Sequence, residues 1–230
     1  MTVLVTWNIQ CGRGVDGRID LARIARTVMA GGAPDILCLQ EVARHMPALD
    51  GGQGADQVQA LTDLFPGYEA AYGAAVDHRG RDGTRARFGN LVLSRYPILD
   101  VLCHALPRPA EAGVLHMPRQ ATEVAVDLPG GGLRVATTHL EFHAARQRLA
   151  QVERLRERHQ EASANARAPA ATAPEGSPYS DAMGFETAIV CGDFNALPDE
   201  PVYRRMLDDF DGAAPEFADA WRVCHPDAAH

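Results

Sequence analysis

Four apolar stretches of the sequence each end in a polar residue whose side chain could take part in chemistry. Asn8 follows the first stretch, Glu41 the second, His139 the third, and Asp193 with Asn195 the fourth. A single polar residue after a strand is usually only a turn residue. Four such endings together supply a carboxylate pair, two amides and an imidazole, so we expect them to form a site.

This set of side chains suits metal-assisted hydrolysis of a phosphoester. Mg²⁺ prefers hard oxygen ligands and keeps several waters, so Glu41 and Asn8 could hold it, and Mn²⁺ is the alternative ion. The metal would polarise a phosphoryl oxygen. His139 could donate to a non-bridging phosphate oxygen. Asp193 could orient or deprotonate the attacking water, with Asn195 placing the phosphate or that water.

The motifs around these residues resemble the endonuclease/exonuclease/phosphatase superfamily, which includes pancreatic-type deoxyribonuclease, apurinic endonucleases, bacterial sphingomyelinases and inositol polyphosphate phosphatases. The resemblance spans residues 2 to about 225. It rests on five segments that occur in the order and rough spacing of that superfamily: Thr6-Trp7-Asn8-Ile9, Leu39-Gln40-Glu41-Val42, Gly89-Asn90 through Pro97-Ile98, Thr138-His139-Leu140 and Gly192-Asp193-Phe194-Asn195.

The resemblance implies a fold and a role for each site residue. The fold is an α/β (α+β) four-layer α/β/β/α sandwich of two mixed, mainly antiparallel sheets. Asn8 and Glu41 would hold the metal, His139 would contact the scissile phosphate, and Asp193 with Asn195 would serve the nucleophile. Two further residues would contact the substrate phosphate, Arg119 and Asn90.

The sequence departs from the superfamily pattern after Asn195. Members of the superfamily end with strands that carry an Asp and then a Ser-Asp-His triplet, and no such triplet is present here. We therefore expect a single domain over 1–230 that is incomplete at its C-terminus and lacks the last strands. His225, Asp227 or His230 would be substitutes only if a strand positioned them. A catalytically impaired or dead binding module of the same fold is the alternative, and an uncovered sheet edge predicts self-association.

Composition narrows the class of protein without naming a substrate. A net charge of -8 over 230 residues argues against a broad basic surface that binds nucleic acid. It is compatible with a local basic cleft. Five cysteines without a C-x-x-C pair favour a reducing, cytoplasmic location. No signal peptide or membrane span is expected. The substrate could be a nucleic acid, a phospholipid headgroup or an inositol phosphate.

Hydrophobic periodicity predicts short strands alternating with helices around one core. Strands are expected near 3–7, 36–39, 90–94, 98–102, 121–128, 133–138 and 188–191, and helices over 19–30, 58–65 and 144–162. Residues 77–87 are expected to form a flexible loop and 163–184 a mobile surface insertion.

Several other side chains have a plain structural interpretation. His139 and His143 are spaced like a zinc pair, but His139 ends a strand, so a shared helical face is not expected. Glu141 and His143 are expected on an exposed rim, and the alternative is that they shape the substrate pocket. The arginines of 144–162 are expected on a solvated helix face. Two interpretations remain for the arginines of the 77–87 segment: they bind a phosphate group of the substrate, or they lie on a solvated loop. These are Arg79, Arg81, Arg85 and Arg87.

Overall fold

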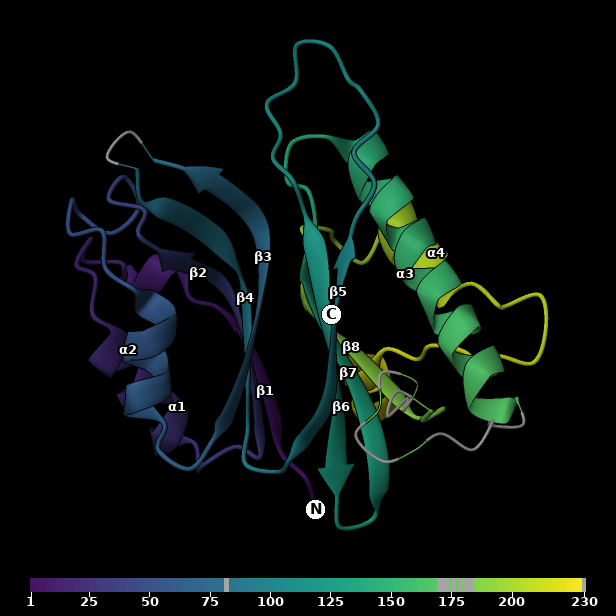
Figure 1. Ribbon diagram of the computed structural model, residues 1–230. Coiled ribbons are helices and arrows are strands. Elements are labelled where there is room, and N and C mark those ends of the chain that lie inside the picture. Colours follow the sequence, from purple (N-terminus) through teal and green to yellow (C-terminus); the bar gives the residue numbers. More distant parts are fainter. Residues whose placement is uncertain (81–82, 169–173, 175–176, 178, 180–183, 229–230) are drawn as a thin grey trace.

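The computed structural model describes residues 1–230 except 81–82, 169–173, 175–176, 178, 180–183 and 229–230. Two four-stranded sheets face each other (Figure 1). The first has the order β1-β2-β4-β3, with bounds Leu4–Asn8, Ile36–Arg44, Arg85–Ser94 and Glu69–Arg79. The second has the order β5-β6-β7-β8, with bounds Ile98–Ala105, Gln120–Leu128, Gly131–His139 and Ala188–Asp193.

Helices cover the outer face of each sheet, which gives the four layers that the sequence predicts (Figure 1). The first sheet carries α1 (Leu21–Ala30) and α2 (Gln57–Leu64), and the second carries α3 (Ala145–Arg167) and α4 (Pro201–Leu207). A short 3-10 helix η1 (Gln10–Gly12) follows β1, and α5 (Ala220–Cys224) lies near the C-terminus. Among the strands of the described residues, only β1–β2 and β7–β8 pair in parallel. Each parallel pair is joined through a helix, α1 or α3, because parallel strands need a long crossover.

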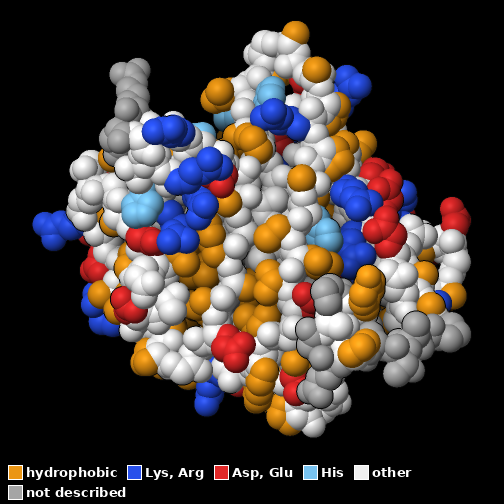
Figure 2. All heavy atoms as spheres, viewed as in Figure 1, with side chains coloured by type: hydrophobic (Ala, Val, Ile, Leu, Met, Phe, Trp, Pro, Cys, Tyr) orange, Lys and Arg blue, Asp and Glu red, His pale blue; other side chains and the backbone are white. Residues whose placement is uncertain are grey.

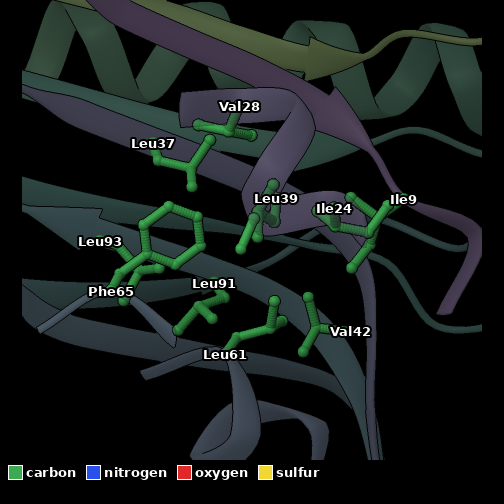
Figure 3. Close-up of a cluster of buried hydrophobic side chains, with 11 residues drawn as sticks. Ile9, Ile24, Val28, Leu37, Leu39, Val42, Leu61, Phe65, Leu91 and Leu93 are labelled. Atoms are coloured by element: carbon green, nitrogen blue, oxygen red, sulfur yellow. The ribbon is translucent and has the colours of Figure 1, made fainter. Parts of the chain in front are cut away.

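Alternation along the strands separates two apolar faces. Leu37, Leu39, Leu91 and Leu93 point outward and pack against α1 and α2, as Figure 3 shows. The other face of the same strands meets the second sheet in a core that contains Ile36, Cys38, Val92, Val124, Val126 and Val135. The aspartates before α1 and α2 accept hydrogen bonds from the first helical turns, so each helix begins at the residue after its cap.

Residues 77–87 are not the flexible loop that the sequence predicts. They contain the end of β3 and the start of β4, which pair out to Arg79 and Arg85. The whole of β3 escapes prediction because its sequence is rich in small residues with low strand propensity. The small residues have a packing reason: a Cβ on Gly73 would lie 2.1 Å from Thr122 Oγ1 of the opposite sheet.

The second strand also runs further than expected. β2 does not end at Glu41 but continues to Arg44, and its pairing with β4 shifts between Leu39 and Val42. Such a bulge bends the strand and re-aims the side chains at it. Glu41 lies in this irregular stretch with φ 59.

The solvated face that the sequence predicts for the arginines of α3 is confirmed only in part: Arg146 is exposed, and Arg154 pairs with Glu157 and Glu161 at the surface. Arg148 and Arg156 are buried, and Arg156 donates to the main-chain oxygens of Met206, Asp208 and Asp209 at the end of α4. Figure 2 shows mixed acidic and basic side chains on the exposed surface over α3. The helix thus uses its long polar side chains to bind neighbouring segments. α3 continues to Arg167, and most of the expected insertion at 163–184 lies outside the described residues.

Within the described residues, β1 is one edge strand of the first sheet and β8 is one edge strand of the second. These two strands lie against each other on the same side of the sandwich. No helix in the described part of the chain is both long and apolar enough to cross a membrane.

A buried charge cluster joins α3 to the second sheet. Glu123 Oε1 on β6 accepts from Arg134 at 2.6 Å, and its Oε2 atom accepts from Arg158 at 3.1 Å and lies 2.7 Å from His104 Nε2. Burial alone would raise the pKa of Glu123. The hydrogen bonds from His104 and Arg134 and the charge of Arg158 outweigh burial and lower that pKa to about 2.

We predict that Glu123→Gln lowers the free energy of unfolding by about 3 kcal/mol at neutral pH. A carboxylate whose folded pKa is depressed stabilises the fold above its unfolded pKa, and this contribution is lost as pH falls through the folded value. The stability difference between the two proteins should therefore shrink from about pH 4.5 towards pH 2. Urea unfolding followed by circular dichroism at several pH values measures it. A difference that stays constant over this range would contradict the prediction.

Candidate active site

The side chain of Asn8 joins the two halves of the site. Its Nδ2 atom lies 2.9 Å from Glu41 Oε1 and 2.9 Å from Asp193 Oδ2. Its Oδ1 atom accepts a hydrogen bond from the main-chain nitrogen of Gln10. Asn8 and Asp193 are 185 residues apart in sequence and belong to different sheets. The structure thus brings together the side chains that end the first, second and fourth predicted strands.

The strand pairing explains this convergence. Asn8 lies opposite Gln40 in the parallel pair β1–β2, and His139 lies opposite Asp193 in the parallel pair β7–β8. Parallel strands bring their C-terminal ends to one edge of a sheet. Because β1 lies against β8, the two edges meet.

The turn after β8 holds Asp193 in place. Gly192 has φ 132, and a Cβ there would lie 1.9 Å from the main-chain oxygen of Thr138, so only glycine fits. Asn195 donates from its main-chain nitrogen to Asp193 Oδ1 at 3.0 Å and from its side chain to Leu140 O at 2.9 Å. Asn195 therefore fixes the carboxylate and ties the turn after β8 to the turn after β7.

His139 is buried between the carboxylates. Its Nε2 atom is 3.6 Å from Asp193 Oδ2 and its Nδ1 atom is 3.9 Å from Glu41 Oε1. Burial, followed by the positive charge of Arg119, lowers the pKa of His139 to about 4, although Asp193 and Glu141 oppose the shift. The imidazole is therefore neutral at pH 7, with one nitrogen able to donate a hydrogen bond.

Arg119 lies on the other side of His139. The two side chains line one small hollow together with Asn90 and Met117. Arg119 Nε donates to Glu141 Oε2 at 3.2 Å, while its Nη1 atom is buried without a hydrogen-bond partner. Glu141 is 1% exposed, so the prediction that it lies on an exposed rim is wrong. His143 is exposed, as expected.

Asn90 is buried between the two sheets. Its amide nitrogen donates to the main-chain oxygens of Gln120 at 3.4 Å and Thr137 at 3.3 Å. This side chain therefore links β4 to β6 and β7 at the edge of the hollow, and its contact with substrate phosphate stays a prediction.

The site is open to solvent on the side of β1 and β8. Glu41 and Asp193 keep 23% and 31% of their side-chain surface exposed. An open groove beside them is lined by Asn8, Asp193 and Asn195 and by the apolar side chains of Trp7, Phe142, Phe194 and Leu197. A ligand could therefore reach the carboxylates without a conformational change.

The arginines of the β3–β4 hairpin lie apart from this cluster. Figure 2 shows basic side chains gathered over the end of that hairpin. Arg85 and Arg87 both pair with Asp77, at 2.8 and 3.3 Å, so part of their charge is neutralised. Arg81 lies outside the described residues. Near the C-terminus, His225 stacks on Trp221 at the surface.

One known protein family matches this sequence over nearly its whole length. Over residues 5–228 the chain matches the model of the Endonuclease/Exonuclease/phosphatase family. The chain belongs to this family. The comparison with curated proteins gave no match.

Solved structures of this family share the fold. An endonuclease/exonuclease/phosphatase from Beutenbergia cavernae is 28% identical over 80% of this chain and 52% of its own, with a TM-score of 0.54. A Bacteroides thetaiotaomicron mannosyl-6-phosphatase is 16% identical over 90% of this chain and 70% of its own, with a TM-score of 0.61. A humanized D. rerio TDP2 is 22% identical over 98% of this chain and 72% of its own, with a TM-score of 0.58. The chain thus spans about half the length of the Beutenbergia protein.

Two residues of this family member escaped prediction as parts of the site. Gln40 was recognised only as part of a motif, but its buried amide bonds to both sheets. Glu141 carried a usable signal: it is two residues after His139, the spacing that keeps side chains on one face of an extended chain.

We predict that the imidazole of His139 in the metal-free protein titrates near pH 4, because it is buried next to Arg119. The unfolded chain, with an ordinary histidine pKa of about 6.5, binds the proton first, so this group makes stability rise from about pH 4 to 6.5. NMR of the histidine ring protons measures the midpoint, with His139→Ala to assign the resonance. Arg119→Ala should move the midpoint upward. A midpoint near 6.5 in the unmodified protein would refute the assignment.

Proposed function

We propose that this chain hydrolyses phosphoester bonds with the help of Mg²⁺ or Mn²⁺. The observation that carries the proposal is the convergence of Glu41, Asp193 and Asn8 beside a neutral, buried histidine. Membership of the Endonuclease/Exonuclease/phosphatase family supports this class of reaction.

The donor set fits a hard divalent cation. The described residues contain no group of three or more His, Cys, Asp or Glu that could hold a metal. An amide oxygen would therefore serve as a metal ligand beside a carboxylate. Mg²⁺ needs only one or two carboxylates because it keeps several waters. Asn8 and Glu41 would hold the ion. Because Asn8 Nδ2 faces Glu41 in this structure, the amide would rotate to present its oxygen and would give up the hydrogen bond from Gln10 N. The bound ion would polarise a phosphoryl oxygen and offset negative charge.

The chain's own residues would bind the attacking water and the phosphate, and the leaving oxygen would take its proton from solvent, to which the site is open. Asn195 holds Asp193 Oδ1, and the Oδ2 atom, which accepts from Asn8 Nδ2 in this structure, would accept the proton of the attacking water. Neutral His139 donates to a non-bridging oxygen of the phosphate. Arg119 offers the unpaired Nη1 atom to the same group, because a guanidinium forms strong charge-assisted hydrogen bonds with phosphate.

We propose broad classes for the substrate, the partner and the cellular location. The substrate is a phosphate ester of nucleic acid, a phospholipid headgroup or an inositol phosphate. The outer strands β1 and β8 offer main-chain edges, and Ile189 on β8 is partly exposed, which supports self-association. The free cysteines support a reducing, cytoplasmic location.

We predict that Glu41→Gln weakens Mg²⁺ binding at least about tenfold, because the metal loses its charged ligand. Isothermal titration of Mg²⁺ and Mn²⁺ into both proteins measures the affinity. Glu69→Gln is the matched control, since Glu69 accepts a hydrogen bond from Ile98 outside the site. Equal affinity of the wild-type protein and Glu41→Gln would remove Glu41 from the ligand set.

We predict that Asp193→Asn and His139→Ala each lower kcat on the order of 10²–10⁴-fold, the usual effect of losing a positioned acid or base. The assay uses bis(p-nitrophenyl) phosphate and p-nitrophenyl phosphate with Mg²⁺, which also separates diester from monoester activity. Asp100→Asn is a control outside the site, and Cys38→Ala should lower stability rather than turnover because Cys38 is buried in the core.

The same assay decides between the two functions. Metal binding without turnover in the wild-type protein would support the alternative, a catalytically impaired binding module. Near-normal turnover in Asp193→Asn would refute the role given to that residue.

A further inference from the structure

Glu141 is an ionised carboxylate in an almost fully buried position. Its Oε1 atom accepts from the main-chain nitrogen of His143 at 3.0 Å, and its Oε2 atom accepts from Arg119 Nε and Met117 N at 3.2 and 3.4 Å. Burial alone would raise the pKa of Glu141, but these hydrogen bonds and the charge of Arg119 lower it overall. A buried charge needs such partners, because it is costly without them.

The first turns of α3 hold the segment that carries Glu141. Arg148 Nη1 donates to the main-chain oxygens of Glu141 and Phe142 at 2.7 and 2.9 Å, and Gln151 Oε1 accepts from Glu141 N at 2.9 Å. The segment therefore cannot shift without breaking contacts to a long helix.

The same turns of α3 hold the loop that leads to Arg119. Gln151 Nε2 donates to Pro107 O at 3.2 Å, and Gln147 Nε2 donates to Pro109 O at 3.0 Å. The ion pair between Glu141 and Arg119 thus joins two loops that share one support.

This arrangement leaves one side of the Arg119 guanidinium unpaired. Arg119 is 7% exposed and lines the hollow that it shares with His139, and its Nη1 atom is buried without a hydrogen-bond partner. Burying an N–H group without a partner costs about 1–3 kcal/mol. The hollow has room for about one water-sized atom. One oxygen of a phosphate bound at its mouth would supply the missing acceptor, because a guanidinium matches phosphate geometry.

We propose that Glu141 is a positioning residue, which binds the Nε side of Arg119 so that the opposite nitrogen faces the substrate phosphate beside His139. The inference rests on the proposed phosphoesterase function. Glu141 acts through Arg119 and does not touch the substrate, so its effect on phosphate binding must disappear when Arg119 is absent.

The first test compares binding of inorganic phosphate to the wild-type protein and to Glu141→Gln by isothermal titration at one fixed Mg²⁺ concentration. In Glu141→Gln an amide N–H₂ group replaces one acceptor, so Arg119 loses its partner. We expect phosphate to bind roughly tenfold more weakly, as for one lost charge-assisted hydrogen bond. The matched control is Glu123→Gln, which removes an equally buried carboxylate and leaves Arg134, on the helix-covered face of the sheet, without its partner. Its phosphate affinity should equal that of the wild type.

The second test is a double-mutant cycle with Arg119→Gln. Glu141→Gln should change phosphate affinity by less than about twofold in the Arg119→Gln background, because contacting residues are not additive when one acts through the other. Additive losses would overturn the proposal, as would unchanged affinity in folded Glu141→Gln. If Glu141→Gln does not fold, Glu141→Asp, which keeps the charge on a shorter arm, replaces it in both tests, with the same expected direction and the same overturning results.

The outcomes separate this inference from the proposed function. Phosphate binding that depends on Glu141 in a protein without turnover would support the inference and refute the enzymatic proposal. Turnover in the wild type with a phosphate affinity that is insensitive to Glu141 would do the opposite. Absence of phosphate binding by the wild type would overturn the anion site itself.

Discussion

The buried amide of Gln40 determines where the two sheets meet. From β2 it donates to Thr6 Oγ1 at 3.1 Å, to the main-chain oxygen of Cys38 at 3.2 Å, and across the sandwich to Thr137 Oγ1 at 2.9 Å. A buried amide needs hydrogen-bond partners, because removing it from water without replacing its hydrogen bonds costs free energy. The observed register of the two sheets satisfies it. In that register the ends of β1 and β2 face the ends of β7 and β8, and the site forms between them.

The interior is therefore divided into an apolar part and a polar part. Valine, isoleucine and cysteine side chains fill the space between the sheets at the other end of the strands. Towards the site, Gln40, Asn90, Gln120 and Thr122 replace them, and Gln120 donates to the main-chain oxygen of Gly73 on the opposite sheet. Packing of apolar side chains tolerates small shifts, whereas hydrogen bonds require set distances and angles. The polar part consequently holds the catalytic candidates more firmly than an apolar core would.

Helix α3 gives the same support from the outside. Its buried polar side chains reach the main chain of the segments that carry Arg119 and Glu141, and Arg156 binds the end of α4. A helix whose inner face is polar stabilises the fold less through hydrophobic burial. It gains specificity, because each hydrogen bond fits one loop conformation.

Local sequence was sufficient for much of the fold. Apolar stretches predicted most of the strands, and helical spacing predicted α1 and α2. The motifs indicated the layered sandwich and the residues at the strand ends. Local patterns failed where tertiary contacts decide the conformation. The small residues of β3 form a strand only because β4 pairs with them and β6 approaches closely, and the bulge at Glu41 arises from pairing with β4.

By itself, then, the sequence determined that Asn8, His139 and Asp193 lie at the ends of strands, since strand endings depend on neighbouring residues and their propensities. It also determined the hard oxygen character of the candidate ligands. Only the tertiary structure decided that Asn8 lies between Glu41 and Asp193, that His139 is buried and neutral, and that Glu141 is an internal partner of Arg119. These are properties of distance and burial between segments up to 185 residues apart. Such contacts depend on the register of two facing sheets, which no local pattern encodes.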